Sequence, residues 1–229
     1  MKFLRSQKLW KVIGSIMVIF GLLFLMAEPI QHAYVRHRSN QLTNQTEVAA
    51  YNEGSESVSY DFSNVTEVTL EDVLKSQFNQ HVLPVVGSLA IPEIGMHLAI
   101  LEGVSNENLI SGAGTMKPDQ EMGKGNYSLA SHNMKDPTLL FAPLHQAKIG
   151  MKAYLTDKEM IYVYELAIHE IIEPTRVDVI RDTETKLLTM ITCNYNGEMR
   201  LNTQGELIDS FPVGEAPEDI ATIFNLPIH

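Results

Sequence analysis

The hydrophobic positions of this chain form one long run near the N-terminus and a series of short runs after residue 85. The long run, residues 12–27, reads VIGSIMVIFGLLFLMA and contains no charged residue. As a helix it would span about 24 Å, and the flanking Trp10, Lys11 and Ile30 extend it at the membrane interfaces. The pattern predicts a transmembrane anchor over residues 12–30.

A cleaved signal peptide is the alternative interpretation of this run. Its apolar region is usually about 7–15 residues long, and a small-residue cleavage site follows it. Here Glu28-Pro29-Ile30 follows the run, so an uncleaved anchor is favoured. Four basic residues precede the run, and basic residues favour the cytoplasmic side. We expect residues 1–11 in the cytoplasm and the folded body outside, as a single-pass protein of the cell membrane.

A polar stretch separates the anchor from the short apolar runs. Residues 39–66 are rich in Ser, Asn, Thr, Glu and Gln, which is typical of a solvated linker. Thr69 with acidic residues after it predicts a short helix over 69–74. We expect an extracellular stalk over 31–74 and the functional domain over 75–229.

The short runs after residue 85 are bounded by Gly, Pro, Asn and Asp and predict about eight strands. Short helices are expected at residues 139–147 and 217–224. Many short strands with few helices predict an all-β domain, as a barrel or a sandwich. The expected strands are 86–92, 97–101, 127–132, 151–155, 161–172, 186–193, 199–201 and 206–213.

The charge of the body argues against nucleic acid as a partner. The formal net charge is −11. Residues 1–38 carry six Lys/Arg and one acid, which leaves 11 basic and 27 acidic residues and a charge of −16 in the remainder. Such an acidic body repels a phosphate backbone.

Cys193, the only cysteine, ends the predicted strand 186–193 and is the candidate nucleophile. A lone cysteine is commonly an inert buried residue. In an exported protein it has no disulfide partner within the chain and is exposed to oxidation, which favours a reactive thiol. A strand end holds the thiol in place, and a neighbouring imidazole or guanidinium favours the thiolate.

His132 is the candidate base. It ends the predicted strand 127–132 and follows Ala130 and Ser131, whose small side chains leave room for a substrate. Among the other histidines, two lie near the anchor, one is the terminus and two lie within predicted strands, where a structural or surface role is favoured. The competing histidines are His32, His37, His81, His97, His145, His169 and His229.

Arg200 is the candidate oxyanion partner. The pair Asn196-Gly197 between two strands predicts a hairpin, which would bring Arg200 close to Cys193. A solvated ion pair is the ordinary role of such an arginine. Arg176 and Arg181, in the segment before the cysteine strand, are the alternatives.

These motifs resemble those of the sortases, the transpeptidases of the Gram-positive cell surface. Residues 189–193 (TMITC) are similar to the Thr-Leu-x-Thr-Cys signature, with Met in place of Leu. Residues 87–92 (GSLAIP) resemble the opening strand of the sortase barrel. Residues 114–116 and 126–133 (NYSLASHN) resemble the stretch that delivers the family's histidine. The resemblance covers roughly residues 75–225, and the order His, Cys, Arg agrees. Arg200 follows the cysteine more closely than in many members.

The resemblance implies an eight-stranded sortase-type β-barrel and a cysteine transpeptidase. Cys193 would attack the Thr–Gly carbonyl of an LPxTG-like sorting signal, and His132 would protonate the departing amine. Arg200 would stabilise the oxyanion. Thr192, together with the two small residues before His132, would contact the substrate. An amine of lipid II or of peptidoglycan would then resolve the thioester.

An N-terminal anchor without a C-terminal apolar span resembles class A, the housekeeping sortases. The alternatives are a pilus-related or specialised sortase, and a non-enzymatic binding module built on the same barrel. A papain-like peptidase is disfavoured because Cys precedes His in that family, and the Q-A-C-x-G motif of caspases is absent.

No resident cofactor is expected, and calcium is the alternative. Some class A sortases are stimulated by calcium through acids in loops beside the active site. The loop before His132 has Asp119 and Glu121, but Lys117 and Lys124 bring ammonium groups that oppose a bound cation.

Overall fold

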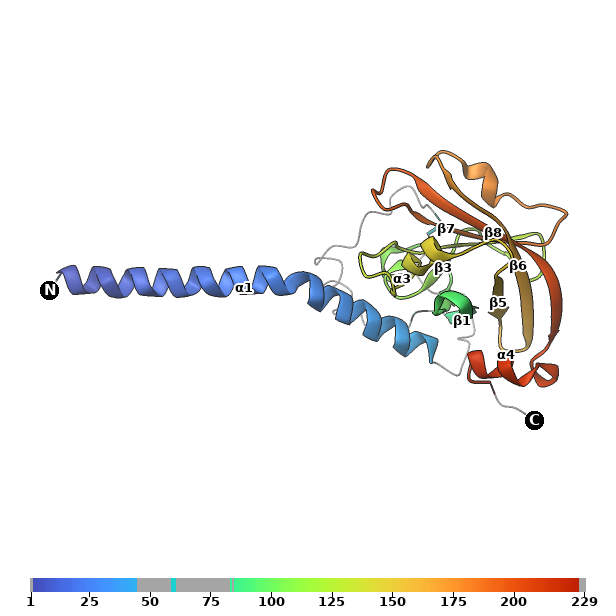
Figure 1. The fold of residues 1–229 in the computed structure, drawn as a ribbon, viewed down its shortest axis with the longest axis horizontal. Helices are drawn as coiled ribbons and strands as arrows, with labels where there is room; N and C mark the ends of the chain where they lie inside the picture. Colours follow the sequence, from blue (N-terminus) through green and yellow to red (C-terminus); the bar gives the residue numbers. More distant parts are fainter. Residues whose placement is uncertain (1, 45–58, 61–82, 84, 227–229) are drawn as a thin grey trace.

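A computed structural model of the chain describes residues 2–44, 59–60, 83 and 85–226. One long helix, α1 (Lys2–Thr43), leads into a closed barrel of eight strands (Figure 1). Around the barrel the strands follow the order β1-β2-β3-β4-β7-β8-β6-β5, and β5 pairs with β1 to close it. The all-β barrel with an N-terminal helix confirms the fold class expected from the sequence.

The described strands and short helices have the following bounds. The strands are β1 (Val85–Ile91), β2 (Met96–Leu101), β3 (Ala113–Thr115), β4 (Asn126–Ala130), β5 (Lys152–Thr156), β6 (Met160–Ile172), β7 (Leu187–Cys193) and β8 (Arg200–Pro212). The short helices are η2 (Pro92–Ile94), α3 (Asn106–Leu109), η3 (Ala142–Gln146), η4 (Val177–Ile180), η5 (Val213–Glu215) and α4 (Glu218–Ile223). The helices expected at 139–147 and 217–224 correspond to η3 and α4, and that at 69–74 lies outside the described residues.

The barrel interior is a close-packed apolar core. Residues from several strands, among them Leu89, Ile100, Leu129, Leu155 and Met190, are fully buried. Side chains alternate between the two faces of a strand, so each strand contributes every second residue to this core. The core therefore forms a rigid body on which the strand ends are fixed.

The strand assignments at 199–201 and 206–213 are wrong, because both belong to the single strand β8. The intervening polar residues suggested a turn, but they are buried within the sheet. Gln204 Nε2 donates to Thr189 Oγ1 at 2.8 Å, and a Cβ on Gly205 would lie only 3.1 Å from the backbone oxygen of Glu165. The eighth strand is instead β3, whose three residues contain no large apolar side chain that would have indicated it.

The structure also differs from the expected stalk at residues 31–43. These residues continue α1, and Val35, Ser39 and Leu42 are buried in contact with the barrel. Polar neighbours conceal this short buried face in the sequence. The helix includes a span, within Trp10–Thr43, of mean hydropathy 2.1 and is long and apolar enough to cross a membrane. The expected boundary at 74/75 lies outside the described residues.

Candidate active site

Parallel pairing of β4 with β7 brings His132 and Cys193 to the same end of the barrel. The carboxyl ends of these two strands form the edge of the barrel there. The last residue pair of this ladder is Ala130 with Ile191. One residue on, the Ser131 N–H donates to the Ile191 carbonyl at 3.3 Å, and Thr192 Oγ1 donates to the Ser131 carbonyl at 2.8 Å. The next residue after Ser131 is His132, and the next after Thr192 is Cys193. The two predicted residues therefore occupy matching positions, Cys193 as the last residue of β7 and His132 two residues after β4.

The β7–β8 hairpin makes Arg200 the direct strand partner of Cys193. The hairpin expected at Asn196-Gly197 is present, with a connection of six residues, 194–199, and with Gly197 at φ 77°. The side chain of Arg200 also braces this loop, because its Nη1 donates to the carbonyls of Gly197 at 3.2 Å and Met199 at 3.3 Å. The local hairpin thus places a guanidinium beside the thiol strand.

The two alternative arginines lie in the β6–β7 loop, residues 173–186. Arg176 is exposed and pairs with Asp178 at 2.8 Å, and the Arg181 carbonyl accepts a bond from Asn126 at 3.0 Å. Among the three candidates, only Arg200 is paired with Cys193 in the sheet.

The backbone that follows β4 holds His132 in a closed loop. The Phe141 N–H donates to the His132 carbonyl at 3.1 Å, and Asn133 bridges to Leu140. Asn133 Nδ2 also donates to the Asn194 carbonyl at 3.3 Å, directly after Cys193. His132 is buried, with 6% of its surface exposed, and Cys193 is half-buried. This geometry suits a pair of groups that act on one substrate.

The predicted substrate-contacting residues Ala130, Ser131 and Thr192 are buried beneath this edge. Ser131 Oγ donates to the Gly112 carbonyl at 2.6 Å, and the Thr192 hydroxyl joins β7 to the end of β4. In this structure their hydroxyls hold the strands together. A direct contact with substrate stays a prediction.

The structure adds a second histidine beside the cysteine. His145, on η3, stacks on Tyr195 of the β7–β8 loop, with ring centroids 3.8 Å apart and planes 24° apart. Burial lowers the pKa of His145, the backbone of Cys193 opposes this shift, and His169 adds to it. The sequence offered His145 only as a competitor of His132, because nothing local indicates that residues 145 and 195 meet.

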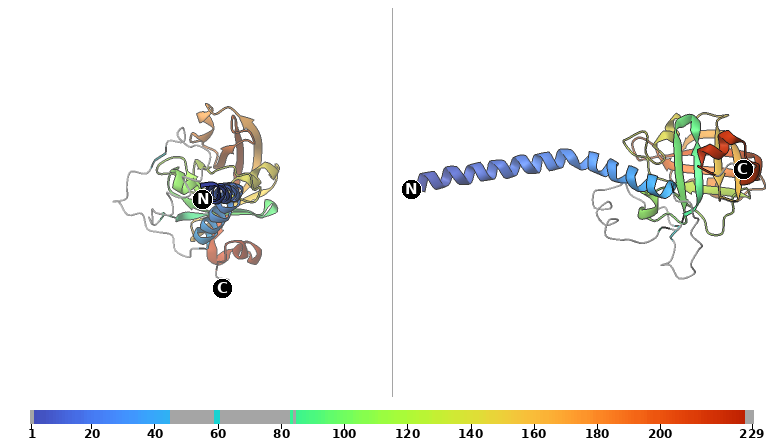
Figure 2. Two further views of the ribbon diagram at one scale, coloured as in Figure 1. Left: turned by 90° about the vertical axis from the view of Figure 1, so that its left-hand side faces the viewer. Right: turned by 90° about the horizontal axis from the view of Figure 1, so that it is seen from below.

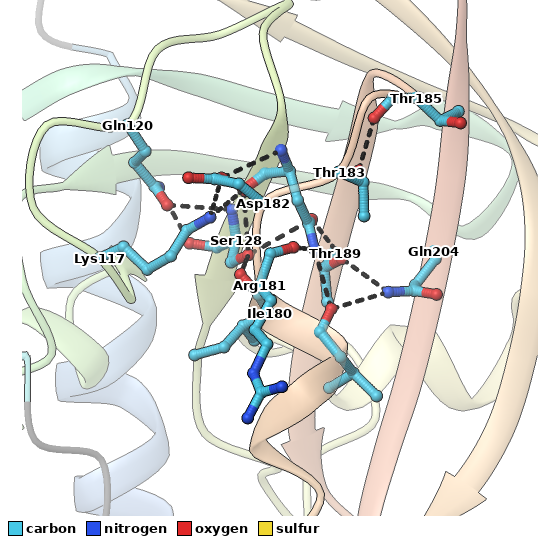
Figure 3. A network of polar contacts seen from close by, with 12 residues as sticks. Lys117, Gln120, Ser128, Ile180, Arg181, Asp182, Thr183, Thr185, Thr189 and Gln204 are labelled. Atoms are coloured by element: carbon cyan, nitrogen blue, oxygen red, sulfur yellow. Dashed lines mark hydrogen bonds and ion pairs between the residues drawn. The ribbon is translucent and has the colours of Figure 1, made fainter.

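A buried polar network fixes the β6–β7 loop across β4 and β7 (Figure 3). Asn126 Nδ2 donates to the Val179 carbonyl at 2.8 Å and to that of Arg181 at 3.0 Å. Thr189 Oγ1 donates to Asn126 Oδ1 at 2.6 Å and accepts from Gln204. The network joins three strands to one loop and supports the strand that carries Cys193.

Thr189→Val is expected to lower the free energy of unfolding by about 1–3 kcal/mol. At nearly constant side-chain volume, the valine removes the two shortest bonds of Asn126 Oδ1 and Gln204 Nε2, at 2.6 and 2.8 Å. These atoms keep only their longer bonds, from Ser128 Oγ at 3.4 Å and to the Val179 carbonyl at 3.1 Å. Urea denaturation followed by far-UV circular dichroism measures the loss. Thr185→Val is the matched control, because Thr185 is exposed. Equal stability of the two variants would contradict the role given to the network.

A second contact fixes the same loop from outside. Lys117 Nζ lies 2.6 Å from Asp182 Oδ1 and 2.7 Å from the Asn126 carbonyl. The Lys117 hydrogen bond lowers the pKa of Asp182. In the loop before β4, Glu121 pairs with Lys124. Within the described residues, no group of three or more His, Cys, Asp or Glu is arranged to hold a metal ion. The ammonium groups of Lys117 and Lys124 therefore lie beside the carboxylates of Asp182 and Glu121.

Comparisons with known proteins connect this geometry to one family. A family model described as the sortase domain matches residues 89–208. Sortase A of Streptococcus agalactiae serotype III is 37% identical, over 92% of this chain and 89% of that protein. Sortase A of Listeria monocytogenes serovar 1/2a is 37% identical, over 86% of this chain and 90% of that protein. The solved structure of Listeria monocytogenes sortase A matches with a TM-score of 0.57 and 39% identity, over 61% of this chain and 96% of that chain.

Proposed function

This chain belongs to the sortase family of cysteine transpeptidases, with class A relatives, and we propose that it cuts an LPxTG-like sorting signal between Thr and Gly. It then transfers the fragment that ends in Thr, through the Thr carbonyl, to an amine of lipid II or peptidoglycan. Surface proteins that carry the signal are its substrates. The observation that supports this most directly is the register that brings the ends of β4, β7 and β8 together.

Each residue of that edge has a distinct role in the proposed reaction. The Cys193 thiolate attacks the Thr carbonyl and forms a thioester, while His132 gives a proton to the departing glycine amine. In the second half, His132 accepts a proton from the incoming amine as it attacks the thioester. Arg200 donates to the oxyanion, where charge develops in both tetrahedral intermediates.

We propose that the apolar helix anchors the protein in the membrane, with the N-terminus cytoplasmic and the barrel extracellular. Residues 12–27 are uncharged, and the basic residues before them favour the cytoplasmic side. This orientation places the barrel on the side where exported proteins and cell-wall precursors meet.

A peptide assay on the purified full-length protein tests the function. A fluorescent peptide containing LPxTG is incubated with excess oligoglycine, and the products are separated by chromatography. We expect the fragment ending in Thr to be joined to glycine. Cleavage without joining would instead indicate a hydrolase or a different acceptor, and no reaction would refute the proposed signal.

Arg200→Ala is expected to lower kcat by about 10²–10³, the effect of removing one oxyanion donor. Arg200→Lys keeps the charge but loses the guanidinium fork, so it should recover only part of the rate. Initial rates of joining measure both variants. Arg176→Ala, an exposed arginine, serves as the control. If Arg176→Ala is the slower variant, the oxyanion assignment is wrong.

Removal of calcium is expected to leave the rate unchanged. The ammonium group of Lys117 lies between Asp182 and the Asn126 carbonyl and links the β6–β7 loop to β4. Calcium prefers converging oxygens free of such groups. Rates are compared in a chelator and in millimolar calcium. Several-fold stimulation by calcium would contradict this account.

A further inference from the structure

The two halves of α1 differ in which side chains are exposed and which are buried. Residues 12–22 and 24–26 are apolar or uncharged and exposed, with Phe24 83% exposed. Farther along, Val35, Ser39 and Leu42 are buried, with spacings of four and three that place them on one face. A helix that is apolar all round suits lipid, whereas a one-sided buried face suits protein. The environment that suits α1 therefore changes near residue 30, from lipid to protein.

The second half of α1 is part of the barrel's packing. Val35 joins the main core cluster, and Leu42 belongs to a smaller cluster with Val85, Ala99 and Leu101. At the end of the helix, the Ala99 N–H of β2 donates to Thr43 Oγ1 at 3.2 Å. Figures 1 and 2 show this half lying along the barrel while the apolar half projects away from it. The helix is therefore a docked element, and the barrel has a defined position relative to the anchor.

Polar contacts tie the docked helix to the loop that follows His132. Glu28, the first charged residue after the apolar run, has Oε1 3.3 Å from Lys135 Nζ. Arg36 Nη2 lies 2.6 Å from Asp136 Oδ2, and Thr138 accepts from the same nitrogen at 3.2 Å. These contacts lie on both sides of Pro29, where a helix is easily bent. They place the loop beside the part of α1 that directly follows the apolar run.

The short chain distance between this loop and His132 limits how far the active site is from the membrane. Lys135 follows His132 by three residues, which span at most about 11 Å when fully extended. Glu28, the partner of Lys135, stands at the end of the apolar span. His132, and with it the neighbouring Cys193, therefore lies close to the end of the apolar span.

We propose that the docked half of α1 holds the catalytic edge of the barrel at the headgroup layer, so that this edge faces the membrane surface. The inference rests on the proposed anchoring of α1 in a bilayer. A reacting amine carried by a membrane-bound substrate would meet Cys193 there without a long reach. An enzyme on a flexible stalk would sample many orientations instead.

Energy transfer to labelled lipid headgroups tests the orientation. The full-length protein is placed in nanodiscs that contain a headgroup-labelled acceptor lipid, with a thiol-reactive donor on Cys193, the only cysteine. A second sample carries the donor on Glu215→Cys in a Cys193→Ala background. Glu215 is exposed and follows the far end of β8, the end opposite Arg200. We expect clearly stronger transfer from the donor at Cys193.

Two double variants test whether docking causes this difference. Val35→Ser with Leu42→Ser should undock the helix and bring the transfer from both positions to similar values. His37→Ser with Gln41→Ser, on the exposed side of the same helix, should leave the difference intact. Far-UV circular dichroism checks that the variants are folded. Equal transfer from both positions in the wild-type background would overturn the proposal.

The energy-transfer result does not depend on whether the protein is catalytically active. Co-elution with nanodiscs reports the anchoring on its own, and a chain that does not co-elute would refute the premise and the orientation together. A protein that shows the orientation but joins no peptide would leave the docking intact and refute the proposed substrate.

Discussion

The Cys193→Ala variant is expected to lose peptide cleavage and joining together, by about 10⁴-fold or more. Loss of the nucleophile in a well-studied serine protease costs about 10⁶ in kcat, because the remaining groups have no atom to acylate. The chain contains no second cysteine that could replace it. Backbone pairing with Arg200 on β8 does not depend on the thiol, so the strand should remain in place.

Product formation by this variant is measured over hours against the wild-type protein. The control is Met190→Leu on the same buried strand, a volume-conserving change that should keep most of the activity. Activity of Cys193→Ala within tenfold of wild type would show that the thiol is not the nucleophile.

The His132→Ala variant is expected to lower the rate of joining by about 10²–10⁴, the usual contribution of a general acid and base. Without the imidazole, the departing glycine amine must take its proton from water, and the incoming amine loses its base. The loop around residue 132 is held by backbone bonds from Phe141 and by Asn133, so the alanine should not displace β4.

His145→Ala is the matched control, since this second histidine also lies beside the backbone of Cys193. Its ring stacks on Tyr195, and we expect its removal to have a much smaller effect than the loss of His132. Steady-state rates of both variants separate the two assignments. A larger loss in His145→Ala would reverse them.

Most strands were predictable from sequence because short apolar runs between turn residues are a local signal. These runs left a barrel and a sandwich open, and only the resemblance to the sortases implied the barrel. The hairpin that places Arg200 beside Cys193 was also predictable from a local signal, since Asn196-Gly197 lies between them. Local signals failed in two places. A buried polar segment looked like a turn within β8, and the short β3 carried too few apolar residues.

Contacts between distant segments could not be read from spacing. Thr189 and Asn126 meet across 63 positions through parallel pairing of β4 and β7, which no local pattern indicates. The docked half of α1 was also hidden, because the buried residues Val35 and Leu42 stand among polar neighbours. His132 could be selected from the sequence as the end of a predicted strand and through the resemblance of residues 126–133 to the sortases. Its position opposite Cys193 depends on the register of the barrel.

The most direct test of the central claim is the intact mass of the protein mixed with LPxTG peptide in the absence of an acceptor amine. We expect a mass increase equal to the peptide fragment ending in Thr, mapped to Cys193 and lost on addition of oligoglycine. The same mixture with Cys193→Ala should show no increase. Joined product from the wild-type protein without any adduct on Cys193, or with an adduct on another residue, would contradict the thioester mechanism.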